Sequence, residues 1–178
     1  MKVFLCGKKN VGKSTFIRKA VKRCGIVPSG FLTVCGENGC EGRWTLHLQD
    51  AACKEYAFTP QNMVACVQAD GSWVSCPEVF DTEGVRLLTF SQKPQLVVMD
   101  EIGFMEKDSP RFQDRILEIL GGPCAVLGVI KPFADANPFL EKIFAHPQVK
   151  TVEITMENRN GTFAELVRML QSYRAHCD

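Results

Sequence analysis

The sequence lacks the features that mark several large classes of protein. No apolar run in its 178 residues approaches the length of a membrane span. The N-terminus passes directly into a predicted strand, so we expect no signal peptide. The formal net charge is only +1, and no basic stripe of the kind that binds nucleic acid is present. Without a visible repeat or linker, we expect a single cytoplasmic domain over residues 1–178.

The nine cysteines lack the tight paired spacing of a zinc site. Their number is odd and several fall in apolar segments, where cysteine acts as a small hydrophobic residue in a reducing compartment. Cys35 and Cys40 have a spacing near that of zinc ligands, and Cys66 and Cys76 could complete a set of four. Because no second tight pair accompanies the first, structural cysteines are favoured, with metal binding left open.

Residues 7–14 read Gly-Lys-Lys-Asn-Val-Gly-Lys-Ser, a full match to the phosphate-binding pattern G-x-x-x-x-G-K-[ST]. A predicted buried strand over residues 3–6 precedes the motif, and a predicted helix over 14–23 follows it. This context favours a polyphosphate cradle over a glycine-containing turn that binds nothing. The residues expected to contact the nucleotide here are Gly7, Lys8, Lys9, Asn10, Val11, Gly12, Lys13, Ser14 and Thr15.

Two of these residues have specific predicted roles. We expect Lys13 to reach the β- and γ-phosphates and to take part in catalysis, and the Ser14 hydroxyl to hold Mg²⁺. The motif therefore predicts a protein that binds a nucleoside triphosphate together with a magnesium ion.

The remaining pattern predicts a mostly parallel α/β sheet with an antiparallel insert. Apolar and polar residues alternate from Trp44 to Gln49, and short strands are expected around 55–58 and 63–68, so residues 43–80 read as a β-meander. Together with the glycine-rich loop before it, the 36–80 segment is expected to be a β-rich insert or flap. Further strands are predicted at 31–35, 95–99, 125–130 and 149–155, and further helices at 85–90, 109–120, 138–144 and 162–173.

Asp100 and Glu101 directly follow the apolar strand at 95–99. We expect Asp100 to bind Mg²⁺ beside Ser14, and Glu101 to polarise an attacking water. A carboxylate base of this kind contributes roughly 10²–10⁴-fold in rate. Residues 100–103 also fit the D-x-x-G of GTP-binding switch proteins, but no Asn-Lys-x-Asp sequence follows, which disfavours a dedicated GTPase switch.

The sequence Asp-Glu-Ile-Gly-Phe-Met-Glu-Lys-Asp-Ser-Pro-Arg-Phe at residues 100–112 resembles the Asp-Glu-Ile-Gly-x-Met-Glu-x-x-Ser-x-x-Phe stretch of the cancer-related (thermophile-type) nucleoside-triphosphatases. The phosphate loop, residues 30–33 followed by Glu37, and residues 157–159 also have counterparts, so the resemblance covers nearly the whole chain. It implies a RecA-like P-loop NTPase fold of three layers, α/β/α, and Mg²⁺-dependent hydrolysis of several triphosphates. The chain departs from the family at 8–11 and 130–132, and in its cysteine-rich meander.

Five further residues have weaker claims to the site. Lys131 follows a strand beside the acidic pair and is placed to sense the γ-phosphate. Arg159 could contact the base or ribose. Glu106 could join the catalytic carboxylates, although a structural role in its loop is favoured. Arg43 and Arg111 are candidates for an arginine that stabilises the transition state.

The sequence therefore predicts a Mg²⁺-dependent nucleoside-triphosphatase that accepts ATP, GTP and other triphosphates and exists as a monomer or weak oligomer. Its alternative is a kinase that transfers the γ-phosphoryl group to a nucleotide, nucleoside or other small acceptor bound by the 36–80 segment. The absence of an arginine-rich lid favours hydrolysis. The third hypothesis is a nucleotide-dependent switch protein. Neither a membrane nor nucleic acid is expected as a partner.

Overall fold

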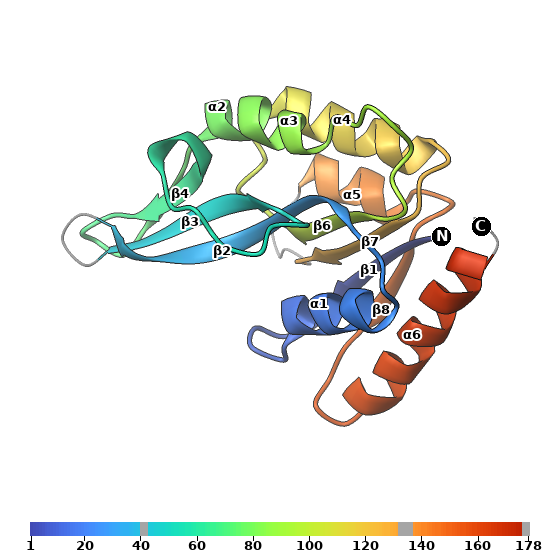
Figure 1. The fold of residues 1–178 in the computed structure, drawn as a ribbon. Coiled ribbons are helices and arrows are strands. Elements are labelled where there is room, and N and C mark those ends of the chain that lie inside the picture. Colours follow the sequence, from blue (N-terminus) through green and yellow to red (C-terminus); the bar gives the residue numbers. More distant parts are fainter. Residues whose placement is uncertain (40–42, 132–136, 176–178) are drawn as a thin grey trace.

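The computed structural model describes residues 1–39, 43–131 and 137–175. Within these ranges, eight strands form one mixed sheet in the order β5-β4-β3-β2-β6-β7-β1-β8 (Figure 1). The strands are β1 (Lys2–Cys6), β2 (Ser29–Gly39), β3 (Arg43–Asp50), β4 (Met63–Val67), β5 (Trp73–Ser75), β6 (Val97–Ile102), β7 (Val126–Ile130) and β8 (Lys150–Glu153). The helical segments are α1 (Lys13–Arg23), η1 (Pro60–Asn62), α2 (Pro77–Val79), η2 (Phe80–Gly84), α3 (Val85–Leu87), α4 (Pro110–Gly121), α5 (Pro138–Phe144) and α6 (Arg159–Ala175).

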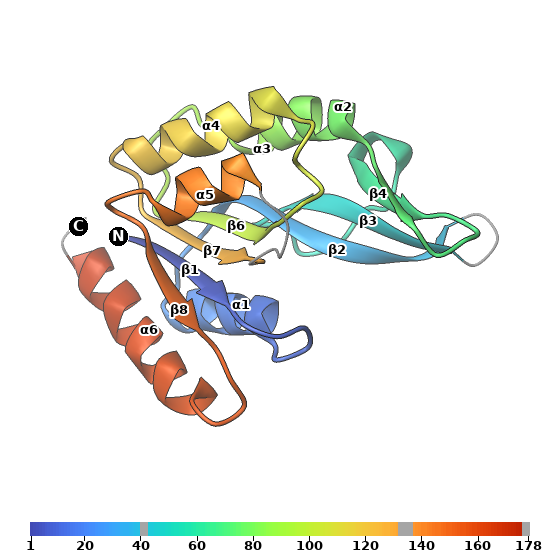
Figure 2. The same cartoon turned by 180° about the vertical axis from the view of Figure 1, so that it is seen from behind.

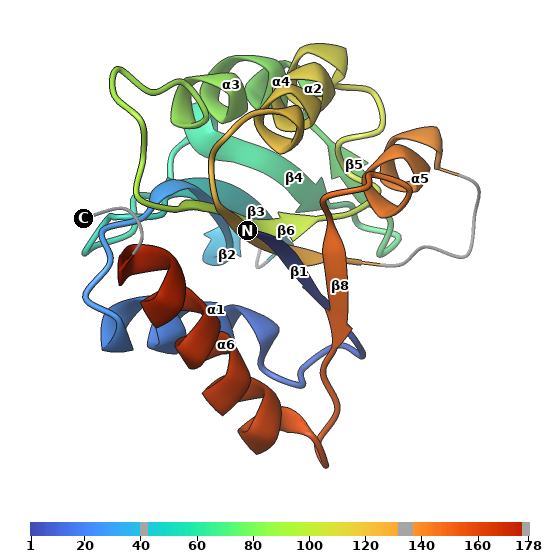
Figure 3. The same ribbon diagram turned by 90° about the vertical axis from the view of Figure 1, so that its right-hand side faces the viewer.

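Five neighbouring strands, β2-β6-β7-β1-β8, are parallel and lie between two layers of helices. Helices α1 and α6 cover one face, and α4, α5 and the helical stretch from α2 to α3 cover the other (Figures 2 and 3). The central strands are continuous apolar runs because both of their faces are buried. The predicted three-layer, mostly parallel α/β fold is therefore confirmed. No helix in the described ranges is both long and apolar enough to cross a membrane.

Each face of the sheet has its own hydrophobic core. Under α4, the Phe112 ring lies 5.2 Å from that of Phe80 and 5.4 Å from that of Phe31, measured between centroids. On the opposite face, α1 and α6 pack together, and their Phe16 and Phe163 rings meet edge to face at 5.1 Å. The first turns of α1 and α6 are thereby packed against each other, directly after the phosphate-binding motif.

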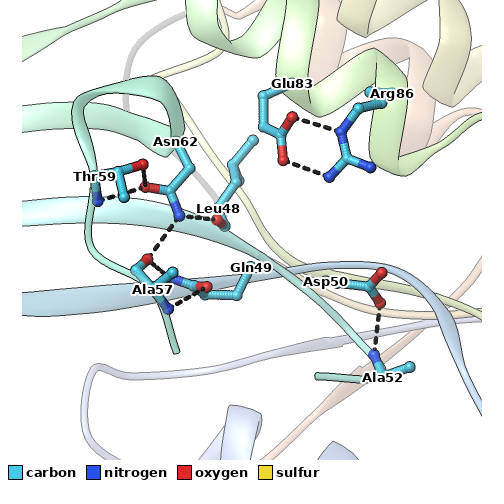
Figure 4. A network of polar contacts seen from close by, with 9 residues as sticks. All are labelled: Leu48, Gln49, Asp50, Ala52, Ala57, Thr59, Asn62, Glu83 and Arg86. Carbon is cyan, nitrogen blue, oxygen red and sulfur yellow. Dashed lines mark hydrogen bonds and ion pairs between the residues drawn. The ribbon is translucent and has the colours of Figure 1, made fainter. Parts of the chain in front are cut away.

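The antiparallel part of the sheet consists of β3, β4 and β5, added beyond β2. The strand predicted around residues 55–58 is wrong, because these residues, all within the described ranges, form a loop. Side chains take the place of a neighbouring strand: Gln49 bonds both backbone groups of Ala57, and the Asn62 amide donates to the carbonyls of Ala57 and Leu48 (Figure 4).

Candidate active site

The phosphate-binding motif forms the loop that connects β1 to α1. Gly7, Asn10 and Gly12 have φ angles of 131°, 66° and 90°, the left-handed region in which glycine is favoured. A Cβ on Gly7 would lie 2.4 Å from the carbonyl oxygen of Ile154, so only glycine fits at this position. The Lys8, Lys9, Asn10 and Thr15 side chains are exposed. The loop thus has the backbone shape that the motif predicts, with the first turn of α1 pointing into it.

Lys13 is 7% exposed and points back into the loop. Its ammonium group donates hydrogen bonds of 2.9 Å to the carbonyls of Gly7 and Lys8. Burial lowers the pKa of Lys13, whereas the negative charges of Glu101 and Asp100 raise it. The ammonium group therefore lies within the loop, in electrostatic range of both acidic residues of β6.

Asp100, in β6, lies beside the first turn of α1. The Ser14 hydroxyl donates a 3.0 Å hydrogen bond to Oδ1 of Asp100, 86 positions away in the chain. Asp100 is 2% exposed, and burial, helped by the charge of Glu101, raises its pKa to about 7. The Ser14 bond and the positive charges of Arg18 and Lys13 oppose this rise. Asp100 and Ser14 thus place a carboxylate and a hydroxyl side by side, in buried surroundings that disfavour the charge of the carboxylate. Both groups are oxygen ligands suited to a magnesium ion, whose coordination shell phosphate oxygens would complete.

Glu101 extends from the same strand toward β7. Its backbone N–H donates to the Thr33 hydroxyl at 3.2 Å, and its carboxylate forms an ion pair with the Lys131 ammonium group. Both side chains reach solvent, with exposures of 26% for Glu101 and 42% for Lys131. Because β7 lies between β6 and β1, Lys131 stands between the acidic pair and the phosphate loop. The predicted position of Lys131 beside the γ-phosphate is thus compatible with the fold.

Glu106 lies in the turn after β6 and is 3% exposed. Its Oε2 accepts a 3.0 Å hydrogen bond from the backbone N–H of Gly103. Burial, together with the charge of Glu101, raises the pKa of Glu106 to about 7. The side chain holds the turn, as the sequence suggested, and lies within electrostatic range of Glu101 and Lys131.

The three candidate arginines are less clearly related to the site than the acidic residues are. Arg159 is the first residue of α6 and is exposed, with Nη1 3.8 Å from the sulfur of Met156. Arg111 is exposed in the first turn of α4. Arg43 begins β3, but its side chain lies outside the described residues, as does Cys40 of the suggested zinc set. Among the described residues, no three His, Cys, Asp or Glu side chains form a metal-binding group.

Sequence reasoning missed two residues at this site. Arg18 lies one helical turn after Ser14, lowers the pKa of Asp100 through its charge, and donates to the Tyr56 hydroxyl at 3.0 Å. Its spacing of four residues from Ser14 was the available signal. Thr33 supports the Glu101 backbone from the neighbouring strand β2, and only the strand order shows that contact.

A cavity of about 450 Å³ lies at the other end of the strands. Its lining includes Ser29 at the start of β2, Asp50 at the end of β3, and Arg86, which forms a bidentate ion pair with Glu83 (Figure 4). Ligands of open parallel sheets bind at the carboxyl ends of the strands, where the phosphate loop is. This cavity is therefore separate from the candidate active site.

A parallel order β2-β6-β7-β1-β8, a glycine-rich loop after β1 and an acidic pair on β6 together define a RecA-like P-loop nucleotide-binding protein. A family model described as NTPase matches residues 2–167, and the chain belongs to this family of enzymes. The chain is 24% identical to nucleoside-triphosphatase THEP1 of Aquifex aeolicus, over 96% of this chain and 99% of the relative. It is 30% identical to the cancer-related nucleoside-triphosphatase homolog of Bos taurus, over 97% of each.

Two solved structures are similar along nearly their whole length. The crystal structure of THEP1 from Aquifex aeolicus gives a TM-score of 0.71 at 23% identity, covering 96% of this chain and 99% of that one. The solution structure of a human cancer-related nucleoside triphosphatase gives 0.67 at 27% identity, covering 96% and 97%. The family resemblance carried by residues 100–112 is thus confirmed.

Proposed function

We propose that this chain is a Mg²⁺-dependent nucleoside-triphosphatase that hydrolyses ATP, GTP and other triphosphates to the diphosphate and phosphate. One observation carries the proposal: the fold brings Lys13, the Ser14–Asp100 pair and the Glu101–Lys131 pair to one edge of the sheet. Membership of the NTPase family supports it. The enzyme would act in the cytoplasm as a monomer or weak oligomer.

The phosphates would be held by the amides of residues 7–15 and by Lys13. In the free protein, Lys13 bonds to the carbonyls of Gly7 and Lys8, which are weaker partners than a charged phosphate. A bound triphosphate would replace these carbonyls as the partner of the ammonium group with little rearrangement, because the Lys13 side chain already points into the loop. Lys13 would then stabilise charge that develops on the β,γ-bridge during cleavage.

Magnesium would be held by Ser14 and Asp100, with phosphate oxygens and water completing its shell. When bound, the ion supplies positive charge that neutralises the β- and γ-phosphate oxygens. Asp100 accepts a proton more readily than an ordinary carboxyl group because it is buried. Binding of a cation beside it would favour the ionised form, so metal binding and proton release from Asp100 would be linked.

Glu101 would orient the attacking water and accept its proton. For this, the Glu101 carboxylate must leave its ion pair with Lys131 and contact the water instead. The γ-phosphate would then replace Glu101 as the anionic partner of Lys131. The exposure of both side chains permits that exchange. Lys131 would in this way respond to the terminal phosphate.

Nucleoside contacts are proposed for Arg159, which begins α6 next to the loop that follows β8. No guanine-reading sequence follows the acidic pair, so base discrimination is expected to be weak. Arg43 and Arg111 stay predictions for the transition-state arginine. Neither carries any step of the proposed reaction.

Product analysis tests the proposal against phosphoryl transfer. The protein is incubated with Mg²⁺ and ATP, GTP, CTP or UTP, alone and with a panel of nucleosides, and free phosphate is compared with phosphate transferred. We expect free phosphate from all four triphosphates, with kcat/KM values within about two decades of each other. Quantitative transfer to an acceptor would instead identify a kinase. Discrimination of roughly 10⁴-fold between bases would mean a site that reads one base edge.

A further inference from the structure

The turn after β6 contains a carboxyl group whose burial is not explained by the shape of the turn. Glu106 is 3% exposed, and one of its oxygens accepts the Gly103 N–H. A glutamine would accept the same hydrogen bond through its amide oxygen. Burying an ionisable carboxyl costs more than burying an amide. Holding the turn therefore requires an acceptor at this position, but not a charge.

The turn that Glu106 holds supports Lys131. The Lys131 backbone N–H donates to the carbonyl of Ile102 at 2.9 Å. The stem of Lys131 passes over Gly103: a Cβ built on that glycine would lie 3.7 Å from both Cβ and Cδ of the lysine. A direct structural chain therefore runs from the Glu106 carboxyl group through Gly103 to the side chain that pairs with Glu101.

Lys131 interacts with two acidic groups. It forms an ion pair with Glu101, and its positive charge lowers the pKa of Glu106. The charged groups of the described residues that act on Glu106 are Glu101, from β6, and Lys131, directly after β7. When Glu101 turns to the attacking water, the carboxylate of Glu106 still attracts Lys131.

We propose that Glu106 is a positioning residue for hydrolysis, whose carboxylate fixes the turn at Gly103 and keeps Lys131 at the active site when Glu101 releases it. The inference rests on the proposed function and assigns Glu106 no contact with the substrate. Its effect is exerted through Lys131, so it concerns the rate of the chemical step and leaves triphosphate binding largely to the phosphate loop.

The sign of the pH dependence follows from the position of Glu106. Burial raises its pKa from an ordinary value of 4.5 to about 7, so the carboxylate dominates above that pH and the neutral acid below it. Only the carboxylate attracts Lys131. Turnover at saturating Mg²⁺ and ATP is therefore expected to fall as the pH drops through about 7. This step in the pH profile should be absent from a variant in which residue 106 cannot ionise.

The experiment compares Glu106→Gln with Asp108→Asn, the same acid-to-amide change at an exposed position of the same turn. For each, kcat is measured between about pH 5.5 and pH 9, with ATP affinity and thermal unfolding alongside. Glu106→Gln should lower kcat by at least about tenfold near pH 7, leave ATP affinity within about twofold, and remove the ionisation near neutrality. Asp108→Asn should behave as the wild type.

A wild-type kcat and pH profile in folded Glu106→Gln would overturn the inference and leave a purely structural role. Lys131→Met provides a second measurement that does not alter the buried carboxyl group. Because the effect of Glu106 is exerted through Lys131, the ionisation assigned to Glu106 should vanish from the kcat profile of Lys131→Met. An ionisation near neutrality that persists in Lys131→Met also overturns the inference. If the wild-type protein hydrolysed no triphosphate, the proposed function itself would be wrong. If only this inference is wrong, the wild-type protein still hydrolyses triphosphates.

Discussion

The parallel and antiparallel parts of the sheet differ in what they expose. In the parallel part, Val97, Val98 and Met99 of β6 are buried on both faces of the sheet. In the antiparallel part, Trp44 and Trp73 keep 58% and 38% of their surface in solvent. Every residue that carries a step of the proposed hydrolysis comes from the parallel part or the loops that leave it. The parallel part of the sheet therefore positions the residues proposed for catalysis.

The physical reason is strand direction. Parallel strands end at the same edge, so the groups that follow β1, β6 and β7 meet there although they are far apart in the chain. Helices pack on both faces of these strands, and Ser14 at the start of α1 bonds to Asp100 of β6. The antiparallel strands reverse direction at each turn and have helices over less of their surface. Mutations in the two parts should therefore have unequal effects.

The largest expected effect separates the two acidic residues of the parallel part. Glu101→Gln keeps the shape of the side chain but loses the proton acceptor, so hydrolysis should drop by roughly 10²–10⁴-fold while triphosphate binds about as before. Asp100→Asn should weaken Mg²⁺-dependent binding as well as turnover. Single-turnover hydrolysis and equilibrium binding on both variants measure the difference.

Near wild-type turnover of Glu101→Gln would show that another group accepts the proton. Glu106 would be the first alternative, since it is a buried carboxyl group within electrostatic range of Glu101 and Lys131. In that case the two variants of Glu101 and Asp100 would no longer separate base from metal, and the assignment of the base would be wrong.

A large effect on stability is expected under α4. Phe112 is fully buried against Phe31 and Phe80, and a Cβ on Gly84 would meet its ring at 2.6 Å. Phe112→Ala should lower the free energy of unfolding by about 3–5 kcal/mol. Val74→Ala in the edge strand β5, where the side chain is 46% exposed, should change it by no more than about 0.5 kcal/mol. Urea unfolding of both variants tests the contrast, and equal losses would contradict it.

A smaller effect is expected for the phosphate-loop lysine. Lys13→Ala removes the charge expected to face the β- and γ-phosphates, and the fold should survive because the ammonium group bonds to the loop carbonyls of Gly7 and Lys8 and not to a core residue. Triphosphate affinity, measured by calorimetry, should fall at least about tenfold, or about 1.4 kcal/mol. Unchanged affinity in a folded variant would mean that the loop is not used.

The sequence predicted the parallel part well because its signals are local. The phosphate-loop pattern, the apolar run before Asp100, and the Ser109-Pro110 helix start each lie within a few residues. The strand wrongly predicted at 55–58 had no such signal, since the backbone groups of Ala57 are bonded by the side chains of Gln49 and Asn62, and the apolar–polar pattern does not record side-chain bonds of this kind. The last helix begins at Arg159 rather than at 162, because Asn158 and Thr155 exchange hydrogen bonds just before it.

Within the candidate site, the sequence predicted residue types but not their pairings. That Glu101 would pair with Lys131 depends on β7 lying beside β6. Strand order is a long-range property that no motif records. Arg18 was missed for the same reason, because its relation to Asp100 crosses from helix α1 to strand β6.

The smallest expected effect tests whether the antiparallel part acts on the nucleotide. Trp44 in β3 and Trp73 in β5 are exposed aromatic rings, and exposed rings can stack on bases. However, β2, β6 and β7 separate β3 from β1 and its phosphate loop. With strands about 4.8 Å apart, β3 lies about 19 Å from β1 across the sheet. We therefore expect Trp44→Ala and Trp73→Ala to change kcat/KM for ATP and for CTP by less than about threefold. A rise in KM of about tenfold or more in either variant, with kcat unchanged, would mean that the 36–80 segment closes over the base as a flap.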